Sequence, residues 1–156
     1  MNQNNQNIQL TDKGLSSLKK ELNELVNLKR PKLVERLAGA RADGDLKENS
    51  NYHSAREELG FLDGRIEELE YVIKNASIID DSAITNGVAI GTSVKLKVNE
   101  KEVVFHIVGE WEADPMQKKI SHASPLGQAL VGRKVGEKVD VDAPAGKVVY
   151  EVLAID

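Results

Sequence analysis

Cysteine is absent from this 156-residue sequence, and so are long apolar runs. Without cysteine the chain can form neither a disulfide framework, nor a thiolate zinc site, nor a thiol nucleophile. No apolar stretch approaches the roughly 18 to 20 residues that cross a bilayer, and the polar opening MNQNNQN lacks an apolar secretory core. We therefore expect a protein that has no membrane association and stays in the cytoplasm.

Aromatic residues and catalytic motifs are scarce as well. The two phenylalanines, one tryptophan and three tyrosines are too few and too scattered for a base-stacking platform. No serine lies in a G-x-S-x-G pattern, and the glycines occur singly rather than in a Walker or dinucleotide pattern. His53, His106 and His122 are widely spaced and have no carboxylate or thiolate company, which argues against a zinc site.

An overall positive charge is also missing. The chain has 21 Lys and Arg against 25 Asp and Glu, a net charge of −4, which argues against binding bare duplex nucleic acid through a general positive field. One local stripe differs, because between residues 29 and 41 a single acid, Glu35, stands among five basic residues: Lys29, Arg30, Lys32, Arg36 and Arg41. This stripe is either a solvated helix face or a surface that meets phosphates or an acidic protein groove.

Helical periodicity fills the first half of the chain. Apolar residues recur at alternating steps of three and four, which is a heptad seam, at Tyr52, Ala55, Leu59, Leu62, Ile66, Leu69, Ile73 and Ala76. The matching seam of the preceding helix slips around Pro31, where we expect a local bend, and Thr11 is the predicted N-cap. The break at Asp43-Gly44 separates arms of equal length, Thr11 to Ala42 and Asp45 to Ala76. Equal arms predict an antiparallel coiled-coil hairpin about 48 Å long, with its turn at the tip.

Short β-type segments follow. The predicted strands are Val88 to Ile90, Ser93 to Val98, Glu102 to Val108, Lys138 to Val141, and Val148 to Leu153. Ser124-Pro125 can begin a short helix that runs to about Val131. We thus predict an α+β protein in which residues 1–76 form the hairpin, 77–86 a linker, and 87–156 a small α+β domain with a mainly antiparallel sheet.

Three carboxylates, Asp43, Asp45 and Glu48, gather at the predicted tip, residues 43–48. Asp45 and Glu48 are three residues apart, so at a helix start they lie on one side and suit a hard cation such as Mg²⁺, beside further ligands on a partner. The same residues also have the form of a capping box, with Asp45 as N-cap and Glu48 reaching back to it. The spacing leaves both interpretations open.

The segment ARADGDLKENSNYH, residues 40–53, resembles the signature of the Gre transcript cleavage factors, closest to the GreA type. The similarity extends over nearly the whole chain and includes Leu10 to Gly14, Arg30-Pro31, Gly64 to Ile66, Ile107 to Gly109, and Ser124 to Gly127. Its most specific part is the tip motif GDLKEN.

This resemblance implies a coiled-coil hairpin followed by an FKBP-like domain, and bacterial RNA polymerase as the partner. In that family the globular domain docks at the rim of the polymerase's secondary channel, and the hairpin reaches down the channel, where it elicits cleavage of backtracked RNA at its 3' end. Asp45 and Glu48 match the family's metal-binding acids, which would hold Mg²⁺ together with polymerase carboxylates, with no ion bound tightly by the factor alone.

Weaker assignments surround this pair. Asp43, Asn49 and Tyr52 would support the tip, and RNA or polymerase contacts would come from Arg41, Arg56, Lys29, Arg30, Lys32 and Arg36. We expect a monomer that stimulates cleavage without being a nuclease itself. DNA binding, which the family label could bring with it, has little physical support in the charge balance.

Two other functions compete with this interpretation. A Gre-like regulator could occupy the channel and inhibit without cleaving, which the intact acidic pair disfavours. A prolyl isomerase would need an apolar pocket lined by aromatic residues, and the C-terminal half offers only Phe105, Trp111 and Tyr150.

Overall fold

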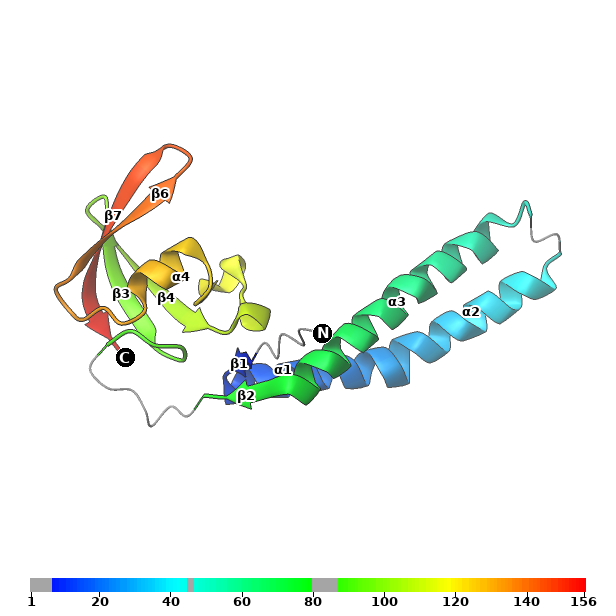
Figure 1. Ribbon diagram of the computed structural model, residues 1–156. Helices are drawn as coiled ribbons and strands as arrows, with labels where there is room; N and C mark the ends of the chain where they lie inside the picture. Colours follow the sequence, from blue (N-terminus) through cyan, green and yellow to red (C-terminus); the bar gives the residue numbers. More distant parts are fainter. Residues whose placement is uncertain (1–6, 45–46, 80–86) are drawn as a thin grey trace, which may run out of the picture. The chain divides into compact units, whose positions relative to one another are not determined.

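The computed structural model describes residues 7–44, 47–79 and 87–156. The chain divides into two units, a helical one at Leu15–Asn75 and a second one that combines the described residues up to Gly14 with those from Ala76 onward. The expected combination of a long helical hairpin and a mostly antiparallel α+β unit is confirmed (Figure 1).

The hairpin packs along the predicted seam. Its first arm consists of α1 (Asp12–Glu24), a π-helical segment (Leu25–Lys29) and α2 (Arg30–Ala42), and its second arm is α3 (Ser50–Asn75). The residues that α3 buries are Tyr52, Ala55, Ile66, Leu69 and Val72, and the first arm buries Leu18, Leu25 and Ala40. Four of the eight predicted seam positions on the second arm are therefore buried and the other four are half-buried, with Val72 rather than Ile73 as the buried residue near the end.

The π-helical segment explains the slip of the seam before Pro31. From Leu25 to Leu33 the seam advances eight residues, one more than a heptad, and a π-helical turn accommodates one extra residue. Pro31 has no N–H to donate to the carbonyl of Asn27, so a regular α-helical bond is missing at this point. The expected irregularity thus lies just before the proline, where the N–H of Arg30 donates to the carbonyl oxygen of Leu25.

The second arm begins later than predicted. The sequence places its start at Asp45, whereas α3 begins at Ser50 and is 26 residues long. The arms are consequently unequal, because Lys47, Glu48 and Asn49, which were assigned to the second arm, precede α3.

A five-stranded sheet forms the second unit, in the order β5-β4-β3-β7-β6. Its strands are β3 (Ser93–Val98), β4 (Lys101–Val108), β5 (Lys119–Ser121), β6 (Lys138–Ala143) and β7 (Gly146–Ile155). All neighbours are antiparallel except β4 and β5, which are parallel. The short β5 was not predicted, while the other four strands lie where the sequence placed them, within a few residues.

The core of this unit lies between the sheet and the short helix α4 (Pro125–Leu130). Val94, Leu96, Ile107, Leu130 and Val152 are fully buried there. The predicted start of α4 is confirmed, because the hydroxyl oxygen of Ser124 accepts a hydrogen bond from the N–H of Gly127 at 3.1 Å.

One predicted strand, Val88 to Ile90, is wrong. Val88 and Ile90 are buried in the core, but their segment belongs to no sheet. The backbone of Val88 instead exchanges hydrogen bonds with the loop after α4, from its N–H to Arg133 and from the N–H of Gly132 to its carbonyl, both at 2.8 Å. The apolar pattern thus predicted the burial of Val88 and Ile90 correctly. The backbone of Val88, however, pairs with the loop after α4 and not with a strand.

A small parallel pair, β1 (Ile8–Leu10) and β2 (Ala76–Ile78), was not predicted. The segment after β1 is held by Glu112, whose carboxylate accepts from the N–H of Thr11 at 2.9 Å, from the hydroxyl of Thr11, and from the N–H of Gly109 at 3.2 Å. Thr11 caps α1 as expected, since its hydroxyl oxygen accepts from the N–H of Gly14 at 3.0 Å. β2 begins at Ala76, the last residue assigned to the hairpin, and continues into the stretch assigned to the linker, of which residues 80–86 fall outside the described parts.

Candidate functional site: the hairpin tip

The tip lies between the end of α2 at Ala42 and the start of α3 at Ser50. The chain leaves α2 at Asp43, whose N–H donates to the carbonyl of Ala40 at 3.3 Å, and passes through Gly44 at a φ of +128°. This left-handed backbone favours glycine, because a Cβ would be strained there. The break predicted at Asp43-Gly44 is confirmed.

Asn49 ties the two arms together at the base of this turn. Its side-chain oxygen accepts from the N–H of Tyr52 at 3.1 Å, which makes Asn49 the N-cap of α3. Its side-chain N–H donates to the carbonyl of Ala40 at 2.5 Å, satisfying an acceptor in the last turn of α2. One side chain therefore closes the end of both helices.

Tyr52, in the first turn of α3, is almost completely buried. The residue is only 8% exposed, and the guanidinium of Arg41 lies 5.8 Å from the centre of its ring. A cation over an aromatic face is an attractive contact. Asn49 and Tyr52 thus both contact residues at the end of α2.

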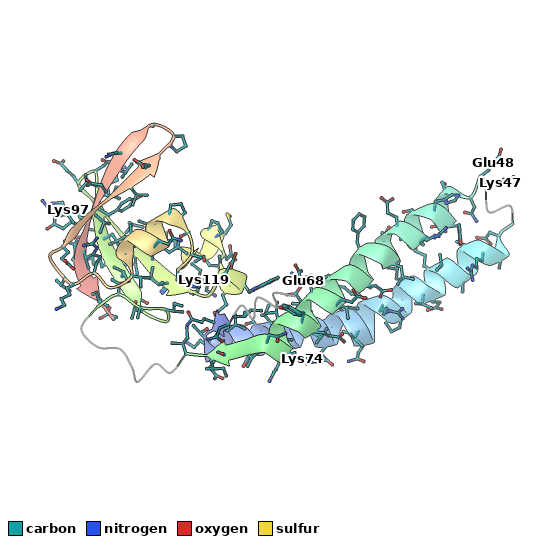
Figure 2. The ribbon with its side chains drawn as sticks, in the orientation of Figure 1. Lys47, Glu48, Glu68, Lys74, Lys97 and Lys119 are labelled. Atoms are coloured by element: carbon teal, nitrogen blue, oxygen red, sulfur yellow. The ribbon has the colours of Figure 1, made fainter. Side chains whose placement is uncertain are left out.

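Glu48 lies in the turn itself, exposed at the far end of the hairpin, as Figure 2 shows together with the neighbouring Lys47. Since α3 begins at Ser50, Glu48 precedes the helix and cannot be the third residue of a capping box. The capping interpretation is therefore wrong for Glu48, and Asn49 is the cap. Asp45, the other half of the predicted pair, lies outside the described residues.

Two exposed carboxylates are described at the tip. Asp43 and Glu48 are both exposed on either side of the turn. Within residues 7–44, 47–79 and 87–156 no three His, Asp or Glu side chains come close enough to hold a metal ion. The donors are hard oxygens, the type that Mg²⁺ takes from one or two protein carboxylates while other ligands come from elsewhere.

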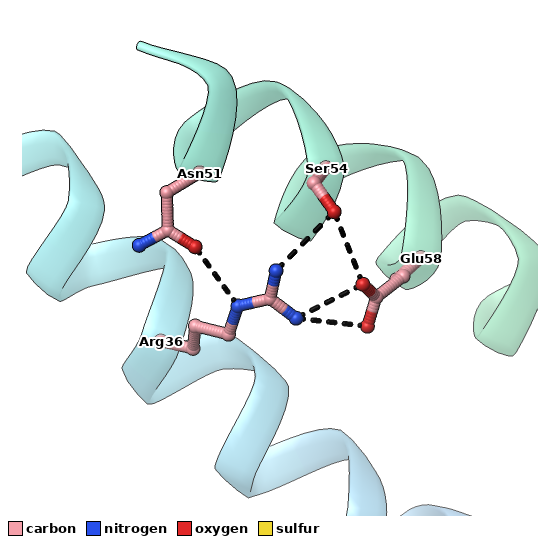
Figure 3. A network of polar contacts seen from close by, with 4 residues as sticks. All are labelled: Arg36, Asn51, Ser54 and Glu58. Carbon is pink, nitrogen blue, oxygen red and sulfur yellow. Dashed lines mark hydrogen bonds and ion pairs between the residues drawn. The ribbon is translucent and has the colours of Figure 1, made fainter.

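The basic stripe separates into two groups. Arg30 and Arg36 contact acids of the opposite arm, with Arg30 donating to Asp63 at 2.8 Å and Arg36 to Glu58 at 2.9 Å. Figure 3 shows Arg36 at the centre of a network, in which it also donates to Asn51 at 3.1 Å and Ser54 at 3.2 Å. Lys29, Lys32 and Arg41 are exposed, as is Arg56 on α3.

These inter-arm contacts shift two pKa values. The hydrogen bonds from Arg36, and after them the one from Ser54, lower the pKa of the Glu58 carboxyl. The hydrogen bond to Asp63 and the negative charge of that carboxylate raise the pKa of Arg30. Both pairs are solvent-exposed, so they fix the register of the arms more than they add stability.

A first prediction follows from the pKa of Glu58. Because folding lowers this pKa, the contribution of Glu58 to stability is present above the ordinary value of 4.5 and is lost as the pH falls through the folded value. In thermal unfolding of the hairpin, Glu58→Gln should have a lower melting temperature than wild type at neutral pH and the same melting temperature as wild type in acid. Glu57→Gln, an exposed neighbour, is the control. A constant gap between Glu58→Gln and wild type at every pH would contradict the ion-pair role.

The partners of the arginines were not predicted from the sequence. Asp63, Glu58, Ser54 and Asn51 carry no motif of their own. The sequence nevertheless allows such pairs to be found. When two residues face each other across an antiparallel hairpin, the sum of their residue numbers is nearly constant along the hairpin. Arg30 with Asp63 and Arg36 with Glu58 share almost the same total and have opposite charges.

Comparison with known proteins identifies the family. The model for "Transcription elongation factor, N-terminal" matches residues 8–78, and the model for "Transcription elongation factor, GreA/GreB, C-term" matches residues 83–156. The chain belongs to the GreA/GreB family of transcription elongation factors. The two matched regions meet within the stretch assigned to the linker, so this GreA/GreB member carries both parts of the family.

Curated relatives agree over almost the full length. Transcription elongation factor GreA of Nitrosococcus oceani is 46% identical over 153 residues, which cover 95% of this chain and 96% of the relative. GreA of Thermodesulfovibrio yellowstonii is 45% identical over 151 residues, with the same coverage. A crystal structure of GreA factor homolog 1 from Thermus thermophilus aligns with 26% identity and a TM-score of 0.47, covering 97% of this chain and 99% of the other.

Two predictions from the sequence, on DNA binding and on membrane association, can be compared with these findings. Nothing in the comparisons supports DNA binding for this GreA/GreB member, in agreement with its net charge of −4. Among the helices of the described residues, none combines the length and apolar character that a membrane span requires.

A second prediction concerns Asn49 in this GreA/GreB factor. Asn49→Ala removes both bonds at the tip and should destabilise the hairpin by about 1 to 2 kcal/mol. Asn49→Asp keeps the oxygen that accepts from Tyr52 but removes the N–H that donates to Ala40, so this variant should lose less stability than Asn49→Ala. Chemical unfolding followed by circular dichroism measures both. Equal stability of wild type and Asn49→Ala would show that Asn49 does not connect the arms.

Proposed function

We propose that this protein binds bacterial RNA polymerase, inserts its hairpin tip into the secondary channel, and stimulates Mg²⁺-dependent endonucleolytic cleavage of backtracked RNA. Arrested complexes are thereby rescued. The observation that carries the proposal is the exposed acid Glu48 in the GDLKEN turn of a GreA/GreB hairpin, at the end farthest from the base of both arms. A long helical hairpin with an acidic tip is suited to placing carboxylates in a site of another molecule.

Asp45 and Glu48 have the central role in this proposal. Together with the polymerase's own carboxylates they would hold Mg²⁺, which when bound supplies water activation and charge neutralisation at the phosphodiester. The factor contributes oxygens and their placement. Asn49 and Tyr52 restrain the turn. Fewer conformations are then available to it, so less ordering is needed when the two acids bind the ion.

Other residues would guide the approach. Arg41 and Arg56 flank the tip and can neutralise RNA phosphates, and exposed Lys29 and Lys32 can contact RNA or polymerase. Arg30 and Arg36 already contact acids of the opposite arm, so their contribution to such contacts is smaller. The unit that contains the five-stranded sheet would dock at the rim of the channel.

The proposal is tested by incubating the protein with a halted, backtracked polymerase complex and Mg²⁺, with the RNA labelled at its 5' end. Shortened RNA that can be extended again is the expected result. The protein with the same RNA but without polymerase should leave it intact, since the factor is not a nuclease alone. Slowed elongation without shortened RNA would identify an inhibitor that occupies the channel and would contradict the proposal.

A further inference from the structure

A groove of about 590 Å³ runs between α2 and α3, away from the tip. The residues that line it are Lys29, Lys32, Leu33, Arg36, Glu58, Phe61 and Leu62. All of them belong to the helical unit, so the groove is a feature of the hairpin itself. We call it the Phe61 groove.

Three of the seven residues that line the Phe61 groove are apolar. Phe61 is 73% exposed, although it is one of only two phenylalanines in the chain. Leu33 and Leu62 are half-buried beside it, because a pair of helices covers only one side of such residues. An exposed aromatic ring next to half-buried leucines is the kind of surface that a protein partner covers.

The charge of the groove is positive. Arg36 and Glu58 form an ion pair with each other at 2.9 Å and so cancel. Lys29 and Lys32 are exposed, and neither has an ion-pair partner among the residues that the structure describes. Two cations on the first arm of the hairpin, one at the end of the π-helical segment and one in α2, are thus uncompensated, and carboxylates of a bound partner would meet them there.

We propose that the Phe61 groove is a docking site for an acidic amphipathic helix of RNA polymerase, whose apolar side chains pack on Phe61, Leu33 and Leu62 and whose carboxylates pair with Lys29 and Lys32. The proposal rests on the proposed function, since it names polymerase as the partner. A helix fits because the space between two packed helices accepts the ridge of a third.

A protein helix explains this surface better than RNA does. Three of the seven lining residues, Leu33, Phe61 and Leu62, are apolar, and the only cations without an ion-pair partner among the described lining residues are Lys29 and Lys32, which is few for a phosphate backbone. One isolated ring gives at most one stacking position. RNA binding remains a distinct outcome that the experiment separates.

The test measures the affinity of the factor, labelled at its N-terminus, for purified core polymerase that contains no nucleic acid. Phe61→Ala should weaken binding about tenfold or more, the effect of losing an aromatic anchor. The matched control is Tyr71→Ala, which removes another exposed aromatic side chain, 55% exposed, from the same helix outside the groove. Tyr71→Ala should bind like wild type. Since Phe61 is largely exposed, Phe61→Ala should retain the wild-type thermal transition.

Charge reversal provides a second, independent variant. Lys29→Glu combined with Lys32→Glu should weaken binding to the same polymerase and reduce its dependence on salt. Lys19→Glu combined with Lys20→Glu makes the same change in charge on exposed residues of α1, outside the groove, and is the control.

The outcomes are distinct. If wild type binds polymerase and Phe61→Ala binds equally well, the groove proposal is wrong while the proposed function stands. If wild type fails to bind polymerase, both are wrong. A loss that appears only with backtracked complexes would assign the groove to RNA. Wild-type dimers in sedimentation that Phe61→Ala abolishes would assign it to a second copy of the chain, and either result would overturn the proposal.

Discussion

Glu48→Gln is expected to reduce transcript cleavage about a hundredfold or more at saturating factor, while the affinity for polymerase changes less than about twofold. Glutamine keeps the size of the side chain and removes the negative charge that a divalent cation needs. Because Glu48 is exposed and lies outside α3, its replacement leaves the helix cap and the seam unchanged. The effect should therefore appear in the rate of cleavage and not in binding or folding.

The controls for this prediction use the same chemistry at other positions. Asp45→Ala should behave like Glu48→Gln, because the two acids are proposed to act as a pair. Glu57→Gln neutralises an exposed acid on α3 away from the turn and should cleave at the wild-type rate. Asp43→Asn tests whether the additional acid before Gly44 contributes. A Glu48→Gln variant with a normal cleavage rate would refute the metal-binding role of Glu48.

The second large effect is expected for Gly127→Ala in α4. A Cβ at Gly127 would lie 2.0 Å from the carbonyl oxygen of Ser121 and 2.9 Å from the Cα of His122, both backbone atoms. Such an overlap forces the helix away from the turn after β5 and should cost about 3 kcal/mol. In calorimetry the transition of the sheet-containing unit should fall by more than about 10 °C.

The same substitution at Gly60 should have the opposite sign. Gly60 lies in the middle of α3, and no atom comes within 4 Å of the position of its Cβ. Alanine there gains helix propensity, worth up to about 1 kcal/mol. If Gly127→Ala left the transition of its unit unchanged, the close packing of α4 on the turn after β5 would be contradicted. Polymerase binding should weaken with Gly127→Ala if that unit docks at the channel rim.

Local sequence patterns predicted the parts of the fold that depend on near neighbours. The seam at Tyr52, Ala55, Ile66 and Leu69, the N-cap at Thr11 and the start of α4 at Ser124-Pro125 each arise from residues a few positions apart. Periodicity and capping are properties of a single helix, so the sequence carries them directly.

Contacts between distant segments were not predictable in this way. The pairing of β1 with β2 joins three-residue strands that are separated by the entire hairpin. Glu112 accepts from Thr11, a partner 101 residues away, and nothing in the local sequence around Glu112 distinguishes it. Short strands and single long-range bonds become visible only once the fold is known.

At the tip the sequence fits a capping box at one position, whereas the structure forms the helix cap at another. Asp45 to Glu48 satisfies the spacing of a capping box, yet Asn49 caps α3, and its side chain also donates to the carbonyl of Ala40 on the other arm. That second bond depends on the hairpin being closed. It leaves Glu48 in the turn and exposed, which is what a metal-binding role in a partner's active site requires.

The central claim, that the tip supplies ligands for Mg²⁺ in the polymerase, is tested most directly by the Mg²⁺ dependence of cleavage at saturating factor. Rates in halted complexes are measured over a series of Mg²⁺ concentrations for wild type, Glu48→Gln and Glu57→Gln. Wild type and Glu57→Gln should reach half-maximal rate at the same Mg²⁺ concentration, and Glu48→Gln should need much more Mg²⁺ or never saturate. An identical Mg²⁺ dependence for Glu48→Gln and wild type would contradict the claim.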